Sequence, residues 1–326
     1  MTIKKTYRRI LVNIGFISLL LFIFILKVKG QDPVFSQFMF HQLNLNPAFT
    51  GNSEFARFVS GYRNQWPSIG KAYVSYYASY DQFVDKISSG IGVSINRDEQ
   101  GRGTFSKTSI DLSYSFPVEL NDGLIMNLGI QGGVVQKRVG GSGIVLQEQE
   151  TITDQSKIYP DFAAGTSFYI NEQYLVSFAV QHLNTPNEMI GGDYAFQSPI
   201  GYTLQMGTHF PSKQASRTRE RLIFQPGLIA HWQKSFNYMG WGTNIQYSSF
   251  IGGIWIRNNF SVNLNTFIFQ VGYSKSGLTL SYSYDFWAPN NYQQIKNIGA
   301  HEVTFTYLFK YKEPKKKMRA IKCPDF

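Results

Sequence analysis

The sequence predicts an all-β fold, a transmembrane outer-membrane β-barrel of about 14 antiparallel strands. Three observations lead to it. Runs of about ten residues alternate apolar and polar side chains. The polar positions hold Gly, Ser, Thr, Asn and Gln and few charges. Aromatic residues make up 16% of the chain, yet its mean hydropathy is only −0.20, which is typical of strands with one apolar and one polar face.

The alternation is clearest in residues 278–286, LTLSYSYDF, where Leu280 and Tyr282 lie on one face and Ser281 and Ser283 on the other. Fourteen segments of this kind are expected as strands. They are 55–64, 70–82, 87–97, 104–116, 122–137, 160–170, 173–182, 198–210, 220–232, 236–248, 250–257, 260–273, 277–287 and 299–312.

The composition of the two faces indicates a membrane barrel. A soluble sheet would solvate its polar face with Lys and Glu, whereas here that face suits a lumen and the apolar face suits lipid. Lipid does not tolerate an open sheet edge, so the sheet must close. Five tryptophans are expected in the girdles at the membrane surfaces: Trp66, Trp232, Trp241, Trp255 and Trp287. The alternative is a large secreted β-sandwich or propeller, but no repeat of blade length is present.

The assigned faces imply different tolerances to charge. Arg at the lipid-facing Val93 or Tyr282 is expected to destabilise the protein much more than Arg at the lumen-facing Ser94 or Ser283.

Residues 1–30 have the architecture of a signal peptide. A basic start is followed by the apolar run of residues 14–26, and Val28 and Gly30 precede the expected cut before Gln31. The alternative is an uncleaved inner-membrane anchor, for which the run is short.

The net charge of +10 does not indicate a nucleic-acid partner. Six cations and no acid lie in residues 1–30, and residues 310–326 hold seven cations against two acids, so the stretch between them is close to neutral.

Residues 313–326 are expected to form a basic periplasmic tail after a barrel of residues 55–312. Cys323 is the only cysteine, so no internal disulfide is possible; it is expected to be a free periplasmic thiol or to pair with a partner.

Residues 31–54 lack the alternation and are expected to form a hatch or docking segment. Asp32 suits the N-cap of a helix that begins at Pro33, and Phe35, Phe38, Met39 and Gln42 would share one face of it. Asn46-Pro47 ends such a helix, and Gly51 permits a tight turn into the first strand. The segment is then either a plug or docking element in the lumen or a leader that packs passively on the barrel mouth.

The same segment, DPVFSQFMFHQLNLNPAFTG, resembles the start of the mature chain in the PorP/SprF family of type IX secretion system outer-membrane proteins. The matching positions are Asp32, Pro33, Phe35, Ser36, Gln37, Asn46, Pro47, Ala48 and Gly51. His41 departs from the pattern, which favours a residue such as Asn there. The chain end is similar to the family's basic Cys-Pro-x-Phe ending, and the expected docking tail comprises Lys315, Lys316, Lys317, Arg319, Lys322, Cys323, Pro324 and Phe326.

This resemblance implies a non-enzymatic barrel that serves protein secretion or gliding motility. It also implies three kinds of partner: outer-membrane lipid, a periplasmic peptidoglycan-associated lipoprotein or other secretion components, and a large secreted adhesin as cargo. No cofactor, metal site or catalytic group is expected, since the five histidines have no ligand spacing. The alternative function is a FadL-like channel for small or hydrophobic solutes, because FadL-type transporters also have fourteen strands and an Asn-Pro-Ala hatch.

Overall fold

The protein is described here from a computed structural model that covers residues 34–70, 72–140, 154–171, 173–191, 196–208, 210–211, 222–234, 236–260, 264–289 and 299–309. The chain divides into two compact units, residues 1–32 and 33–326, and everything below concerns the second. The predicted signal peptide, the motif residues Asp32 and Pro33, and the predicted tail of residues 313–326 lie outside the described residues.

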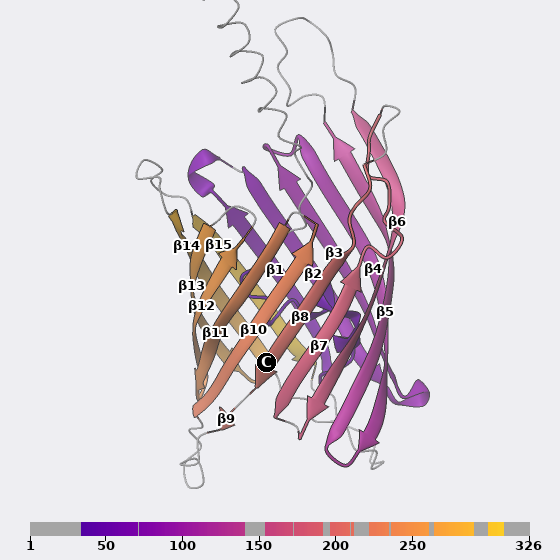
Figure 1. Ribbon diagram of the computed structural model, residues 1–326. Coiled ribbons are helices and arrows are strands. Elements are labelled where there is room, and N and C mark those ends of the chain that lie inside the picture. Colours follow the sequence, from indigo (N-terminus) through magenta and orange to yellow (C-terminus); the bar gives the residue numbers. More distant parts are fainter. Residues whose placement is uncertain are drawn as a thin grey trace, which may run out of the picture. The chain divides into compact units, whose positions relative to one another are not determined.

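Fourteen strands of the described chain close into an antiparallel barrel (Figure 1), as the sequence predicts. Each pairs with its neighbours in chain order, and the ring closes where β1 pairs with β15. The strands are β1 (Ala56–Gln65), β2 (Tyr73–Val84), β3 (Ser89–Gln100), β4 (Phe105–Asn121), β5 (Leu124–Val139), β6 (Gln155–Ile170), β7 (Tyr174–Gln181), β8 (Gly201–Thr208), β10 (Leu222–Gln233), β11 (Phe236–Tyr247), β12 (Phe250–Asn259), β13 (Leu264–Lys275), β14 (Leu278–Pro289) and β15 (Gly299–Phe309).

Three strand boundaries differ clearly from the prediction. β4 extends to Asn121, five residues past its expected end, because its pairing with β5 continues to Asn121 and Leu124. β6 begins at Gln155, five residues before the expected start, because β5 and β6 stay paired up to Val139 and Gln155. The strand expected over 198–210 is shorter, since Ser198 donates its backbone N–H to Pro186 O and belongs to the preceding connection. The two-residue strand β9 (Phe210–Pro211) then pairs with β10.

The two faces of the barrel wall follow the predicted alternation. On β14, Leu280 and Tyr282 are 50% and 39% exposed on the outer face, whereas Ser281 and Ser283 are 1% and 0% exposed on the inner face. Exposed aromatic and aliphatic side chains continue around the barrel, as expected of a surface that meets lipid.

The structure argues against the prediction that Arg costs much less at Ser94 or Ser283 than at the lipid-facing positions. That prediction assumed an aqueous lumen, but both serines are buried, and the Oγ atom of Ser283 accepts a hydrogen bond from Nε2 of Gln37.

The five tryptophans do not all face outward. Trp232 and Trp241 are exposed, and Trp66 packs edge-on against Trp287 near one end of the barrel. Trp255, expected in a girdle, is 2% exposed and points into the lumen, where its Nε1 donates to Oδ1 of Asn244. A lumen partner for the indole N–H explains the difference.

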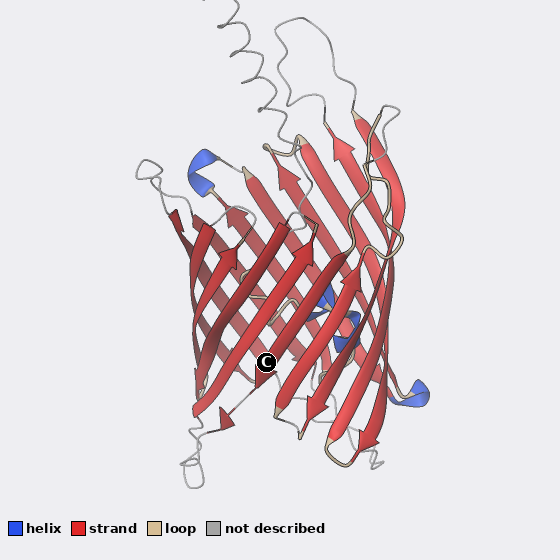
Figure 2. Ribbon diagram, in the orientation of Figure 1, coloured by secondary structure: helices blue, strands red, loops and turns tan. Residues whose placement is uncertain are grey.

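Residues 34–53 lie between the walls of the barrel, and we call them the plug. Its helical turns, drawn in blue in Figure 2, are α2 (Gln42–Leu45) and the 3₁₀ turn η1 (Pro47–Phe49). Two further 3₁₀ turns, η2 (Pro67–Ile69) and η3 (Asp85–Ile87), lie in connections between strands. None of the described helices is long and apolar enough to cross a membrane.

The helix predicted from Pro33 was wrong over the described residues, because helix begins only at Gln42. The four residues expected on one helical face contact different parts of the wall. Phe35 packs on Val59 and Tyr77, whereas Phe38 and Met39 pack on a cluster around Trp255. The predicted break at Asn46 is confirmed, since Asn46 is extended, with φ −157° and ψ 119°.

Candidate functional site: the plug and its anchors

The motif residues of the plug are buried together inside the barrel. Phe35, Ser36, Gln37, Asn46 and Ala48 are all at most 6% exposed. Pro47 and Gly51 are buried as well. The structure therefore assigns the described part of the motif to the interface between plug and barrel wall, over three groups of contacts.

The first anchor joins Ser36 and Gln37 to β14 and β15. Their backbone N–H groups donate to Oε2 and Oε1 of Glu302, over 2.7 and 3.0 Å. Oγ of Ser36 donates to Oδ2 of Asp285 over 2.6 Å. The Gln37 amide donates to Glu302 O and to Oγ of Ser283. One wall carboxylate thus accepts hydrogen bonds from two successive backbone N–H groups of the plug, and hydrogen bonds to a charged acceptor are among the stronger ones in proteins.

Two arginines balance the charge of these carboxylates. Arg63 Nη2 lies 2.7 Å from Asp285 Oδ2, and Arg63 Nη1 lies 3.0 Å from Glu302 Oε2. Arg257 Nη2 lies 3.1 Å from the same Asp285 oxygen. Neither carboxylate is exposed to solvent. Buried charges of this kind require their partners, because a single charge left without one is strongly destabilising.

His41 extends the first anchor to β1. Its Nε2 lies 3.3 Å from Glu302 Oε1, and its ring packs on Phe35 at 4.2 Å and edge-on against Tyr77 at 4.7 Å between centroids. The ring occupies the space above Gly61, where an added Cβ would lie 2.4 Å from His41 Cε1. His41 departs from the family pattern, yet it is part of the contact between plug and barrel wall.

The second anchor is built on Asn46-Pro47-Ala48. Asn46 Oδ1 accepts from the backbone N–H of Ala48 and caps η1, which begins with Pro47. Its Nδ2 donates to Thr166 O on β6 and to Phe178 O on β7. The wall comes very close here, since a Cβ on Gly129 of β5 would lie 2.2 Å from Ala48 N.

The third anchor holds the end of the plug near the start of β1. The backbone N–H of Gly51 donates to Asp81 Oδ2 over 2.8 Å, and Arg57 pairs with the same carboxylate. Arg57 also donates to Oε1 of Gln42 in α2. Gly51 has a φ of +66°, and a Cβ there would lie 2.5 Å from Gly90 Cα, so the predicted tight turn at Gly51 is confirmed.

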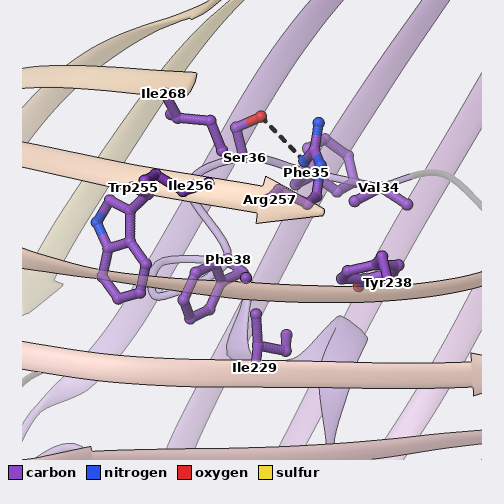
Figure 3. A pocket seen from close by; sticks show the side chains of 11 residues that line it. Val34, Phe35, Ser36, Phe38, Ile229, Tyr238, Trp255, Ile256, Arg257 and Ile268 are labelled. Atoms are coloured by element: carbon purple, nitrogen blue, oxygen red, sulfur yellow. Dashed lines mark hydrogen bonds between the residues drawn. The ribbon is translucent and has the colours of Figure 1, made fainter. Parts of the chain in front are cut away.

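An apolar pocket lies beside the first anchor (Figure 3). Phe38 from the plug meets Trp255 edge-on at 4.8 Å, and Ile229, Tyr238 and Ile268 complete the apolar wall. Arg257 lines the same pocket and donates from Nη1 to Oγ of Ser36, the contact drawn as a dashed line. The pocket therefore combines an apolar wall with one guanidinium group.

The charged wall residues of the anchors were not predicted as site residues. The predicted site residues include none of Arg57, Arg63, Asp81, Arg257, Asp285 and Glu302. The sequence does offer one indication of these residues: they are charged, and they lie on the inner face of the strands, which otherwise holds small polar residues. Their convergence could not be read from the sequence because they belong to five strands.

No metal-binding group of three or more His, Cys, Asp and Glu residues occurs within the described ranges. Glu302 is fully engaged by the plug and Arg63. Among the histidines, His231 is hydrogen-bonded with Oγ1 of Thr203, and His209 lies outside the described residues.

Known outer-membrane barrels have related folds. The CymD monoaromatic hydrocarbon channel is 10% identical, with a TM-score of 0.51 over 83% of this chain and 93% of that chain. The Pseudomonas putida toluene transporter TodX is 8% identical, with a TM-score of 0.49 over 82% and 93%. Omp33 of Acinetobacter baumannii is 7% identical, with a TM-score of 0.46 over 80% and 100%. Identity this low shows a shared fold only, which the TM-score of 0.51 with CymD supports.

The search of curated proteins finds no match to this chain. A family model does match: residues 27–307 match the family described as type IX secretion system membrane protein PorP/SprF. The match spans the plug and nearly the whole barrel, in agreement with the motif now seen at the plug–wall interface. The chain is an outer-membrane β-barrel protein, and it belongs to the PorP/SprF family of type IX secretion system membrane proteins.

Proposed function

We propose that this protein is a non-enzymatic docking and anchoring barrel of the type IX secretion system. In this role it helps a large secreted adhesin to cross the outer membrane or to stay on the cell surface, and it contributes to gliding motility. The chain is exported by a signal peptide that is cleaved before Gln31. On the periplasmic side it binds a peptidoglycan-associated lipoprotein or another secretion component through the basic tail.

The observation that carries the proposal is the plug held by three anchors. A docking barrel needs a fixed shape, and the buried ion pairs of Arg63 with Glu302 and Asp285 provide one. A channel, in contrast, must move its plug to let solutes pass. Moving this plug would remove two backbone donors from Glu302 and the Gly51 donor from Asp81, which favours the docking role.

The connections between strands support the proposed orientation. At the end where β1 starts and β15 ends they are short, for example 122–123, 248–249 and 276–277, with 209–221 as the exception. The opposite end has the long connections 140–154, 182–200 and 290–298. Outer-membrane barrels have short periplasmic turns and longer extracellular loops, so the start of β1 and the tail would be periplasmic.

The test is co-purification from outer membranes solubilised in mild detergent. The full chain is compared with a chain truncated after Lys312 and with a charge-reversal variant at Lys315, Lys316 and Lys317. The truncated chain should insert normally but lose its periplasmic partners. Charge reversal should weaken their retention most at low salt, where the charges are least screened. Truncated protein that keeps its partners and supports secretion would disprove docking through the tail.

The second candidate function is a channel for small or hydrophobic solutes. The apolar side chains of Phe38, Trp255 and their neighbours favour it, because they lie inside the barrel beside the plug. Uptake of a monoaromatic hydrocarbon by vesicles that contain the full-length protein tests this candidate. Uptake by the unmodified protein would favour the channel, whereas uptake only after deletion of the plug would favour the docking barrel.

A further inference from the structure

Three lysines lie directly opposite one another on adjacent strands at one end of the barrel. Lys107 on β4 is paired in register with Lys137 on β5, which is paired with Lys157 on β6. The row lies on the inner face, since Val135 and Tyr159, each two residues away, are buried in the lumen. Like charges directly opposite each other are destabilising, so the row requires an anion.

Glu188, in the connection between β7 and β8, supplies an anion for the lysine row. Its Oε1 lies 3.2 Å from Lys107 Nζ and its Oε2 lies 3.2 Å from Lys137 Nζ. Oε1 also accepts from the Tyr159 hydroxyl over 2.9 Å and from Ser198 Oγ over 3.0 Å. The side chain is almost completely buried.

The charge state of Glu188 follows from these contacts. Burial by itself raises the pKa of the carboxyl, but Lys107, Lys137 and the hydroxyl of Tyr159 outweigh it and lower the pKa to about 2. The group is therefore ionised in any physiological medium.

The wall and the connection contribute differently to this contact. Lys107, Lys137 and Tyr159 belong to barrel strands, so they remain in place whatever the connection does. Glu188 is presented by extended backbone: its N–H donates to Phe196 O over 2.8 Å, beside a β-bridge between Asn187 and Gln197. The wall groups thus form a carboxylate site, and an extended peptide segment now fills it.

The position of the row indicates which ligands can reach it. It lies at the end of the barrel that has the long connections, which indicate the extracellular side. The lysines point into the lumen, away from the outer face, where lipid headgroups would lie. A peptide that enters the barrel mouth can reach them, and a headgroup in the membrane cannot.

We propose that Lys107, Lys137 and Lys157 form a carboxylate-binding row for an acidic, extended peptide segment of a secreted protein, and that Glu188 occupies two of these lysines until such a segment displaces it. The inference rests on the proposed docking function and gives it a recognition site. The exchange replaces one set of ion pairs with another, so a partner with several carboxylates is favoured over the single Glu188. Added salt should weaken binding of the peptide, because salt screens the attraction between its carboxylates and the lysines.

The test measures binding of fluorescein-labelled hexaglutamate to the full-length protein in detergent by fluorescence anisotropy, at about 50 mM salt, where charge interactions are weakly screened. Glu188→Gln removes the competing charge but keeps a group that can accept from Tyr159. It should bind the peptide at least about tenfold more tightly than the unchanged protein. Glu99→Gln is the matched control, because Glu99 pairs with Arg97 at an exposed site on β3, and it should bind like the unchanged protein.

A second variant tests the lysines themselves. Adding Lys107→Gln, Lys137→Gln and Lys157→Gln to Glu188→Gln should abolish the gain, and labelled hexaglutamine should bind none of the variants. Heat modifiability on gels confirms that each variant is folded. Equal binding by Glu188→Gln and the unchanged protein, or unaltered binding after loss of the three lysines, would overturn the proposal.

Purified lipopolysaccharide serves as a competitor in the same assay. Displacement of the peptide by lipopolysaccharide at lower concentration than by unlabelled hexaglutamate would identify the row as a lipid-phosphate site and contradict the peptide assignment. The assay uses purified protein and no secretion components. Its failure is therefore distinguishable from failure of the docking function, which the co-purification experiment measures.

Discussion

Arg63 on β1 lies directly opposite Glu302 on β15, and these two strands close the barrel. The guanidinium Nη1 is 3.0 Å from the carboxylate Oε2, and the same carboxylate accepts the backbone N–H groups of Ser36 and Gln37. The plug is therefore bound at the seam where the first and last strands of the barrel meet. Loss of this contact should affect both the position of the plug and the stability of the closed barrel.

Glu302→Ala should destabilise the protein by about 3–5 kcal/mol, because it leaves Arg63 and two plug N–H groups without their acceptor in a buried site. Urea unfolding of the refolded protein in lipid vesicles measures the change. Glu99→Ala removes an exposed partner of Arg97 and should cost no more than about 1 kcal/mol. Similar losses for the two variants would contradict the role assigned to Glu302.

Gly129→Ala should displace the second anchor, since the new methyl group would lie 2.2 Å from the backbone N of Ala48. We expect a loss of stability of about 1–3 kcal/mol and faster proteolysis within the plug. Gly252→Ala is the control, because no atom lies within 4 Å of a Cβ added there. If the two variants are equally stable and equally resistant to protease, the plug does not pack as closely as described.

Val93→Arg and Ser94→Arg should both be destabilising, for different reasons. Arg at Val93 on the outer face should cost about 2–4 kcal/mol in the middle of the membrane and slow insertion into vesicles. Arg at Ser94, which is 1% exposed, has no free space for its side chain and should loosen the packing inside the barrel, which increases protease cleavage of the plug. A Ser94→Arg protein with an intact, protected plug would show that the lumen has more space than the structure indicates.

Deletion of residues 32–46 removes the first anchor and α2 and most of the contacts that fill the lumen. The barrel should still insert and remain heat-modifiable, because its strand ladders are unchanged, but it should conduct ions and no longer support secretion. Planar-bilayer conductance and a secretion assay test the two expectations. Normal secretion by the deleted form would reduce the plug to a passive leader.

The contact of Glu188 should depend on pH in a defined window. Its pKa in the folded protein is about 2, lower than the ordinary value of 4.5, so ionisation stabilises the folded connection. That contribution should be complete above pH 4.5 and should be lost as the pH falls toward 2. The rate at which an acid-active protease cleaves the connection measures this contribution in the unchanged protein and in Glu188→Gln. The rate for the variant should not depend on Glu188 ionisation between pH 4.5 and pH 2.

The sequence by itself determined the barrel. The alternation in residues 278–286 reappears as an outer face with Leu280 and Tyr282 and an inner face with Ser281 and Ser283. Strand alternation is a local property, because successive side chains point to opposite faces whatever the strand pairs with. The turn at Gly51 and the break at Asn46-Pro47 were predictable for the same reason, since both depend on the backbone of a few neighbouring residues.

Only the tertiary structure decided the conformation of the plug and the identity of its anchors. The apolar spacing from Phe35 to Gln42 predicts a helix, but the N–H groups of Ser36 and Gln37 donate to Glu302, more than 260 positions away in the chain. Trp255 likewise turns inward because Asn244 and Phe38 offer it partners in the lumen. Local patterns report the hydrogen bonds a segment can make with itself. In a closed barrel the wall offers other acceptors, and burial makes those contacts decisive.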